Sequence, residues 1–208
     1  MYGNLSHFDQ AGNAVMVDVS EKAVTRRTAV AGGSIFVNAD VMAAVVSGTS
    51  KKGDVLGVAR VAGIMAVKNT SMIIPMCHTL LINKCSIDFK VDEQALRIDA
   101  VCTVKVDGKT GVEMEALTGV SAALLTIYDM CKAIDRSMTI GQIRLLEKTG
   151  GKSGTYRAQP QTAVTDTDEA AGSQPEQKAK DSPEHCGRTG RLPDCKSFDG
   201  QMGDANTR

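Results

Sequence analysis

The chain has 208 residues, enough for one domain and an additional segment, and a hydrophobic content of 42% supports a substantial core. Its 24 basic and 24 acidic side chains cancel, which argues against a general nucleic-acid binder. The N-terminus lacks the basic and apolar pattern of a signal peptide, and no run of about 18 apolar residues predicts a membrane span. We therefore expect a cytoplasmic protein with no membrane or nucleic-acid partner.

Charge and composition divide the chain near residue 157. Residues 1–157 carry 18 basic and 15 acidic side chains, whereas residues 158–208 carry 6 and 9. The second segment also holds four of the five prolines and almost no large apolar residues, so burial cannot offset its ordering entropy. We predict a flexible N-terminus over 1–14, a folded domain over 15–157, and a disordered tail or linker over 158–208.

The first half of the domain alternates between strand and helix patterns. Apolar spacing predicts strands at 15–19 and 25–37, followed by helices at 39–47 and 54–68. Lys51-Lys52-Gly53 precedes the second helix. This basic turn is either a solvated loop or an anion site, because a helix N-terminus offers free N–H groups and a positive dipole end.

A rigid turn follows these helices. Pro75 forces Ile74 into an extended conformation and stiffens the segment that presents Met76-Cys77-His78. His78 is compatible both with a structural hydrogen bond and with a functional role. The six cysteines form no C-x-x-C pair and no second histidine has ligand spacing, so no metal site is expected.

Three further strands complete the expected sheet. Residues 84–91 and 96–105 alternate apolar and polar side chains, and 92–94 joins them as a hairpin. A last strand is expected near 138–147. An antiparallel sheet with one solvent-exposed face needs helices to cover its other face, so we predict an α+β fold with two layers.

A helix predicted over 111–134 separates the hairpin from the last strand. Thr110 and Glu113 match the capping-box pattern at its start. Asp129 and Lys132 lie three residues apart near its end and are neighbours on its surface. Glu115 and Asp129 are separated by roughly 21 Å along the axis, at 1.5 Å per residue. If both act on one small substrate, a second subunit must complete the site.

The charged residues of this helix have structural alternatives. Glu113 and Glu115 suit any helix N-terminus, where carboxylates are stabilised by about 0.3–1 kcal/mol. Asp129 and Lys132 could form an ordinary surface ion pair. A partly buried Asp–Lys pair could equally donate and accept protons.

A glycine-rich basic loop follows the last strand. Lys148-Thr149-Gly150-Gly151-Lys152-Ser153-Gly154 is not a P-loop, because the motif requires glycine where this chain has Leu146. We interpret it as a mobile loop able to close over an anion. Five cations from several segments could add to a phosphate-binding surface at the Lys51-Lys52-Gly53 turn: Arg26, Arg27, Lys68, Lys148 and Lys152.

Five segments together resemble the cyclic pyranopterin monophosphate synthase family, in order and from about residue 5 to residue 157. They are KKGDV (51–55), IPMCH (74–78), TGVEMEALT (110–118), YDMCKA (128–133) and KTGGKSG (148–154).

The resemblance implies a reaction in molybdenum cofactor biosynthesis. Family members convert 3′,8-cyclo-7,8-dihydroguanosine 5′-triphosphate to cyclic pyranopterin monophosphate and pyrophosphate, as lyases. It also implies a ferredoxin-like antiparallel sheet with helices packed on one face, and a hexamer built as a trimer of dimers with sites at subunit interfaces. No metal or organic cofactor is expected.

Matching motif positions assign roles to residues of this chain. Asp129, Lys132 and Lys52 match catalytic positions. The substrate-binding positions are matched by Met76, Cys77, His78, Glu113, Met114, Glu115, Arg27, Lys68 and Lys148. Thr79 departs from the family, which often has proline after the histidine, and the tail after 157 inherits nothing from short members.

Two other interpretations remain open at this point. A non-catalytic oligomer that binds a nucleotide or pterin would use the same basic pocket without needing Asp129 or Lys132. A structural oligomer would use these charges as interface salt bridges.

Overall fold

The computed structural model describes residues 11–48 and 53–159. They fall within one compact unit, Met1–Thr162, and a second unit, Ala163–Arg208, lies outside the described residues. The described elements are β1 (Thr25–Phe36), α1 (Ala39–Val46), α2 (Val55–Lys68), α3 (Thr70–Ile73), β2 (Lys84–Asp92), β3 (Arg97–Gly108), α4 (Glu113–Cys131), β4 (Thr139–Thr149) and β5 (Tyr156–Arg157).

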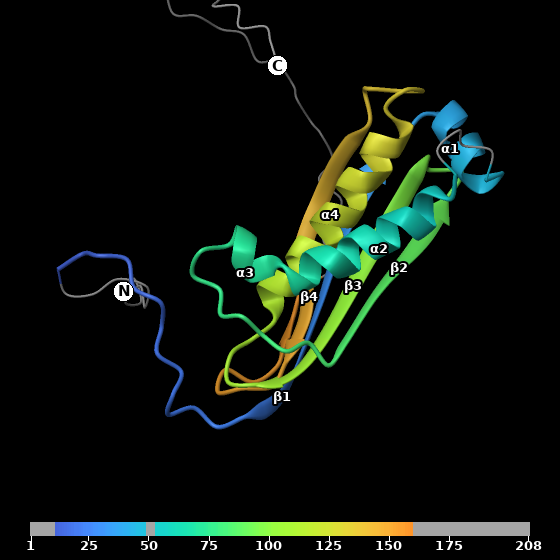
Figure 1. The fold of residues 1–208 in the computed structure, drawn as a ribbon. Coiled ribbons are helices and arrows are strands. Elements are labelled where there is room, and N and C mark those ends of the chain that lie inside the picture. Colours follow the sequence, from blue (N-terminus) through green and yellow to red (C-terminus); the bar gives the residue numbers. More distant parts are fainter. Residues whose placement is uncertain (1–10, 49–52, 160–208) are drawn as a thin grey trace, which may run out of the picture. The chain divides into compact units, whose positions relative to one another are not determined.

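The strands form one antiparallel sheet in the order β2-β3-β1-β4-β5. In Figure 1, α2 and α4 lie side by side across one face of this sheet. Strand–helix–strand–strand–helix–strand connectivity with this order is the ferredoxin-like arrangement, so the predicted fold class is confirmed.

The register of the sheet brings three chain segments to one end. Thr25 at the start of β1 lies opposite Gly108 at the end of β3. On the other side of β1, Thr28 pairs with Thr149 at the end of β4. Helix α4 begins only a few residues beyond β3, so its N-terminus reaches the same end of the sheet.

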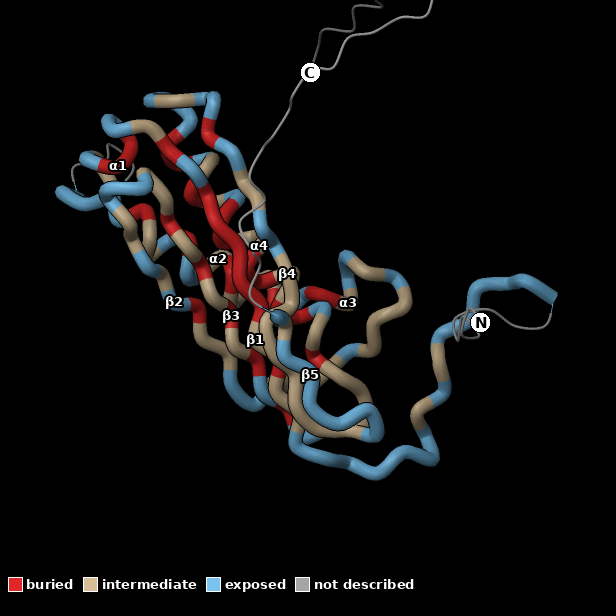
Figure 2. The backbone as a smooth tube through the Cα atoms, turned by 180° about the vertical axis from the view of Figure 1, so that it is seen from behind, coloured by how far each residue is buried: buried red, intermediate tan, exposed pale blue. Residues whose placement is uncertain are grey.

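The core lies between the sheet and α4. Its fully buried members include Ala31 and Ile35 on β1, Ile98 on β3, and Leu124 and Ile127 on α4. Figure 2 shows the buried residues concentrated along β1 and β3. Small residues allow the close packing, and the two long helices cross where Gly63 of α2 meets Gly119 of α4.

The structure confirms the helices predicted at 39–47 and 54–68, the extended Ile74 and the β2–β3 hairpin, and it shows the N-cap of each helix. Asn38 caps α1 by accepting from the Val41 N–H at 2.9 Å. Asp54 caps α2 by accepting from the Gly57 N–H at 2.8 Å. Ile74 is extended, with φ −105° and ψ 105°, as the following proline requires. The hairpin between β2 and β3 closes on Asp92 paired with Arg97.

Two local predictions are wrong. Residues 15–19 do not form a strand; Val17 and Val19 alternate with exposed neighbours but rest on other segments rather than pairing with the sheet. The capping box is also absent, because α4 begins at Glu113 with Val112 at its N-cap and no side-chain cap. The Glu113 carboxylate pairs instead with Lys148, at 3.3 Å.

Candidate active site

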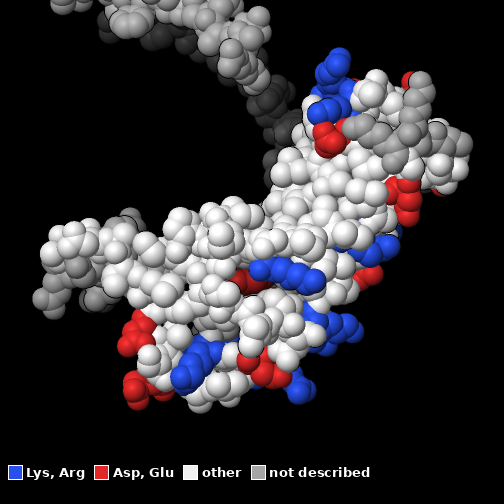
Figure 3. Space-filling view, viewed as in Figure 1, with Lys and Arg blue, Asp and Glu red and all other residues white. Residues whose placement is uncertain are grey.

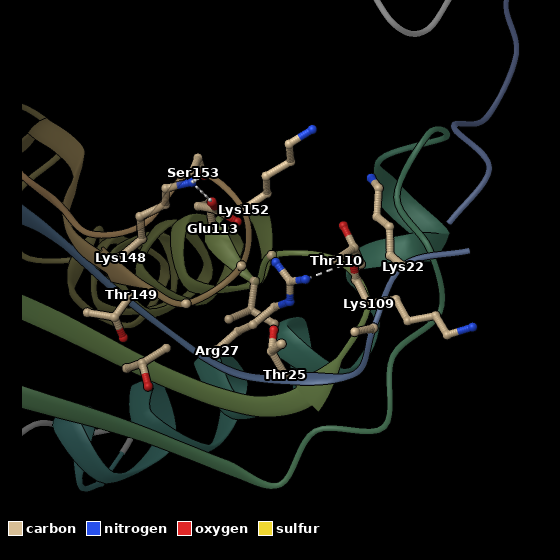
Figure 4. Close-up of a pocket in the computed structure, with 16 residues that line it drawn as sticks. Lys22, Thr25, Arg27, Lys109, Thr110, Glu113, Lys148, Thr149, Lys152 and Ser153 are labelled. Carbon is tan, nitrogen blue, oxygen red and sulfur yellow. Dashed lines mark hydrogen bonds and ion pairs between the residues drawn. The ribbon is translucent and has the colours of Figure 1, made fainter. Parts of the chain in front are cut away.

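A cavity of about 590 Å³ opens at the end of the sheet where β1 begins and β3 and β4 end. Five cations and a single carboxylate line it: Lys22, Arg27, Lys109, Lys148, Lys152 and Glu113. We call this cavity the basic chamber. In Figure 4, Arg27 lies in the middle of the chamber, between Lys148 on one side and Lys22 and Lys109 on the other.

Arg27 is held in place by the backbone that leads into α4. Its Nε donates to the Gly108 carbonyl and its terminal nitrogen to the Lys109 carbonyl, both at 3.0 Å. These bonds leave part of the guanidinium free to face the chamber, since arginine carries five N–H donors. Arg27 can therefore bind an anion without giving up its fixed position.

The loop after β4 folds against this arginine. Gly150 and Gly151 have φ of +91° and +73°, a conformation that favours glycine. A Cβ atom on Gly150 would overlap the Arg26 carbonyl, and one on Gly151 would overlap the Arg27 guanidinium. The glycine-rich loop identified in the sequence thus forms a wall of the chamber.

Lys148 is the best-positioned lysine of the chamber. Its Nζ donates to the Ser153 hydroxyl at 2.6 Å and lies 3.3 Å from the Glu113 carboxylate. Its side chain is about three-quarters buried. Such a lysine is pre-oriented, and an incoming anion would compete with Glu113 for its charge.

A second cavity of about 270 Å³ adjoins the basic chamber. We call it the reading chamber. It is lined by Met76, Cys77, His78, Met114 and Glu115, together with Val17 and Val19. Four residues line both cavities: Lys22, Thr110, Gly111 and Glu113. The arrangement suits a ligand with a polyanionic part and a flat, partly apolar part.

Glu115 is the buried carboxyl of the reading chamber, with only 4% of its surface exposed. Burial raises its pKa, and the nearby charge of Glu113 adds to the increase, although a backbone N–H bond opposes it. Burial likewise raises the pKa of the Cys77 thiol, and the Glu115 charge adds to this effect. A buried carboxylate here can accept N–H donors from a heterocycle.

His78 does not point freely into the reading chamber. Its Nε2 lies 3.0 Å from the carbonyl oxygen of Val17. A carbonyl oxygen only accepts hydrogen bonds, so Nε2 carries the hydrogen in this contact. The opposite ring nitrogen, Nδ1, is then the one left for other partners.

The structure brings most of the predicted substrate-binding residues together, places three predicted residues elsewhere, and does not describe a fourth. Asp129 and Lys132 form an ion pair of 2.7 Å at the other end of α4, with side chains 60% and 51% exposed. Lys68, in the last turn of α2, acts electrostatically on Cys85 of β2 and lines neither chamber. Lys52 lies outside the described residues.

Two cations of the basic chamber were missed by sequence reasoning. Lys22 lies in a polar segment that carries no motif, and Lys109 follows the last residue of β3 and directly precedes the Thr110-Gly111 pair. Proximity to that pair was the available signal for Lys109. Nothing local distinguishes Lys22 from a solvated lysine, because the fold alone brings it to the chamber.

The fold and the two chambers define an α+β protein of ferredoxin-like topology with a cation-lined cavity beside a smaller one. The chain belongs to the MoaC family, whose family model matches residues 16–151.

Curated relatives agree with this assignment. Proteins named cyclic pyranopterin monophosphate synthase from Clostridium botulinum and Thermoanaerobacter pseudethanolicus are each 59% identical, over 75% and 74% of this chain and 98% and 97% of their own lengths. One from Pelobacter propionicus is 56% identical, over 74% of this chain and 96% of its own length.

Two features are absent from the residues that the structure describes. No helix among them is both long and apolar enough to cross a membrane. Within the same residues, no group of three or more histidine, cysteine, aspartate or glutamate side chains is placed to hold a metal ion.

Proposed function

We propose that the protein is a cyclic pyranopterin monophosphate synthase of molybdenum cofactor biosynthesis, acting in the cytoplasm. It converts 3′,8-cyclo-7,8-dihydroguanosine 5′-triphosphate to cyclic pyranopterin monophosphate and pyrophosphate, and is therefore a phosphorus–oxygen lyase. The observation that carries the proposal is the junction of the basic chamber with the reading chamber in a member of the MoaC family.

The basic chamber suits the triphosphate in charge and geometry. Its five cations and one carboxylate leave four net positive charges. Arg27 offers a planar, anchored guanidinium, and Lys148 offers an ammonium group fixed by Ser153. Positioned cations of this kind both bind polyphosphate and stabilise the negative charge on a departing pyrophosphate.

The reading chamber suits the purine-derived ring system. Met76 and Met114 supply polarizable apolar contact for a flat heterocycle. Glu115 supplies a buried acceptor for ring N–H groups, and its burial excludes water that would otherwise compete. Discrimination in such a pocket is strong, because a ligand without the matching donors would leave the carboxyl unpaired.

The proposed catalytic pair must come from another subunit. Glu115 and Asp129 lie at opposite ends of α4, roughly 21 Å apart along its axis. A single small substrate in the two chambers cannot reach Asp129 and Lys132 of the same chain. We propose that a neighbouring subunit supplies Asp129 and Lys132, in a hexamer arranged as a trimer of dimers.

The surface of the helical layer supports an oligomer. Figure 3 shows a broad uncharged area over α2, α3 and α4. Large apolar side chains on these helices are exposed in the single chain: Val58, Val61, Met65, Met72, Ile73 and Leu125. Exposed large apolar side chains on neighbouring helices are typical of a protein–protein interface.

The chemistry then divides between the two groups of residues. Asp129 and Lys132 transfer protons while the purine-derived ring opens and recloses as a pterin. A ribose-derived hydroxyl attacks the α-phosphorus, its proton passing to a base, and the bond to the β-phosphate oxygen breaks. Lys52, Arg27 and Lys148 hold the triphosphate and stabilise the pyrophosphate that leaves.

Pyrophosphate release from the cyclised dihydro-GTP tests the proposal. We expect release by the wild type, none by Asp129→Asn, and normal release by Lys90→Met, an exposed lysine of β2 used as a control. Unchanged substrate binding by Asp129→Asn would place the defect in the reaction. Substrate binding without pyrophosphate release by the wild type would instead indicate a non-catalytic binding protein. Dissociation of the Asp129→Asn oligomer on gel filtration would indicate that Asp129 forms a structural salt bridge between subunits.

A further inference from the structure

The proposed proton-transfer pair lies at the end of a helix. Asp129 is in the last turn of α4, and Lys132 is the C-cap, with φ −59° and ψ −15°. Both side chains are more than half exposed, so burial contributes little to holding them in place. The last carbonyl groups of a helix have no partner within it, and helix ends therefore fray. The 2.7 Å separation of this pair thus depends on how firmly the end of α4 is held.

Tyr128 anchors this end of the helix to the core. Its ring is half-buried and packs against the hydrophobic core. Its hydroxyl donates to the carbonyl oxygen of Arg136, eight residues further along the chain, at 2.9 Å. Its own carbonyl accepts from the Lys132 N–H at 2.8 Å. One tyrosine therefore contacts both the C-cap and the segment that follows it, through a rigid ring with only two side-chain torsions.

A short connection, residues 132–138, leads from the end of α4 to β4 (Figure 1). We call it the exit turn. The N–H groups of Ile134 and Asp135 both donate to the Cys131 carbonyl, at 2.8 and 3.3 Å. These bonds to the end of the helix shape the first half of the exit turn.

A side-chain turn shapes the second half. Asp135 Oδ1 accepts from the N–H and from the hydroxyl of Ser137, at 2.8 and 2.6 Å. These bonds lower the pKa of Asp135, so the accepting carboxylate stays ionised well below neutral pH. Tyr128 bonds the Arg136 carbonyl between the two residues of this side-chain turn. Its hydroxyl therefore ties the middle of the exit turn back to a side chain that is packed on the core.

The exit turn and the two chambers lie at opposite ends of the sheet. Thr139, the first residue of β4, pairs with Phe36 at the end of β1, whereas the basic chamber opens where β1 begins. A change confined to the exit turn should therefore leave the chambers of the same chain intact. Ligand binding and reaction can then be measured as separate consequences of such a change.

We propose that Tyr128 is a positioning residue, which fixes the exit turn so that Lys132 stays within reach of Asp129 and of a substrate bound by the neighbouring subunit. This inference rests on the proposed function. Proton transfer requires its groups to lie within about 2.6–3.2 Å of each other, and a misplacement of about 1 Å can lower a rate about 100-fold. Without the Tyr128 hydroxyl, the end of α4 frays part of the time, and only the remaining molecules hold the pair in a reactive arrangement.

The first experiment measures turnover and binding of Tyr128→Phe beside wild type. Phenylalanine keeps the ring that packs on the core and loses only the hydroxyl. We expect kcat for pyrophosphate release to fall about tenfold, with KM and the dissociation constant for GTP within about twofold of wild type. Arg136→Met is the matched control, because it changes the side chain but keeps the carbonyl that accepts the bond; its kcat should stay within about twofold of wild type.

Amide hydrogen exchange observes the exit turn directly. Tyr128→Phe should speed exchange of the Lys132, Ile134 and Asp135 N–H groups about tenfold and leave exchange at the start of α4 unchanged. Asp135→Ala removes the acceptor for Ser137, so it should also speed exchange in the exit turn and lower kcat. Asp135→Asn keeps an acceptor oxygen and should restore both properties.

The outcomes separate this inference from the proposed function. Unchanged kcat in Tyr128→Phe would overturn the inference, whether or not exchange becomes faster. A raised KM with normal kcat would also overturn it, because Tyr128 would then act on binding. An equal loss of kcat in Arg136→Met would assign the effect to the guanidinium group and would overturn it as well. Absence of pyrophosphate release by the wild type would refute the proposed function and the inference together, whereas the preceding outcomes refute the inference alone.

Discussion

Gly151→Ala tests how strictly the loop after β4 positions Arg27. An alanine Cβ at this position meets two obstacles: the backbone φ of +73°, and the Arg27 guanidinium that a Cβ would overlap. The first costs about 1–2 kcal/mol for an L-residue. The second displaces Arg27 from its bonds to the Gly108 and Lys109 carbonyls.

Gly154→Ala is a matched control for the backbone alone. Gly154 has a similar φ of +67°, but a Cβ there would meet nothing within 4 Å. The difference between the two variants therefore isolates the displacement of Arg27. Hydrogen bonds from a charged group contribute about 1.5–3 kcal/mol. Because the chamber is open to water that can replace part of them, we expect Gly151→Ala to be about 1–2 kcal/mol less stable than Gly154→Ala.

Urea unfolding at a fixed protomer concentration measures the difference in unfolding free energy between the variants, and calorimetric titration measures their affinity for pyrophosphate. Gly151→Ala should bind pyrophosphate about tenfold more weakly than wild type, and Gly154→Ala within about twofold. Equal stability and equal affinity in the two alanine variants would refute the argument, since Arg27 would then adjust without loss.

Three further predictions concern other parts of the structure. Glu115→Gln should stabilise the fold at neutral pH. The buried carboxyl has a raised pKa, so the free energy of unfolding of the wild type falls as pH rises from the unfolded-state pKa through the folded-state pKa. Urea melts at pH 5 and pH 8 should show that the stability advantage of the variant grows with pH. Glu113→Gln should tighten pyrophosphate binding several-fold in a titration, because Lys148 loses a competing carboxylate at 3.3 Å. Gly63→Ala should lower the urea-derived unfolding free energy by about 1–2 kcal/mol, since a Cβ would lie 2.9 Å from the Gly119 carbonyl and the overpacking outweighs the gain in helix propensity.

Elements with a strong local signal were predictable from the sequence. The apolar spacing of α1 and α2 and the alternation of β2 and β3 are short-range patterns, and the structure confirms the elements there. The T-x-x-E pattern at Thr110 predicted a capping box that the structure does not have, because Glu113 pairs with Lys148, a tertiary partner that local sequence cannot reveal. The alternation over 15–19 misled for the same reason, since Val17 and Val19 face the site rather than a neighbouring strand.

The site was predictable only as far as its motifs extend. Motif matching named Arg27, Lys148 and the Met76-Cys77-His78 and Met114-Glu115 residues of the reading chamber, and helix geometry separated Glu115 from Asp129. The bond from His78 to Val17 joins residues 61 apart in sequence, and Lys22 reaches the site only in the folded chain. Such contacts depend on the packed fold and leave no periodic trace in the sequence.

The placement of charged groups at both ends of α4 has a genetic consequence. If each site takes Glu115 from one chain and Asp129 from its neighbour, a Glu115→Ala allele and an Asp129→Asn allele damage different halves of a site. Oligomers assembled from both chains would contain some sites in which both halves are intact and others in which both are defective. Two alleles that are inactive alone would then complement each other when co-expressed, whereas two alleles altered at the same end of the helix would not.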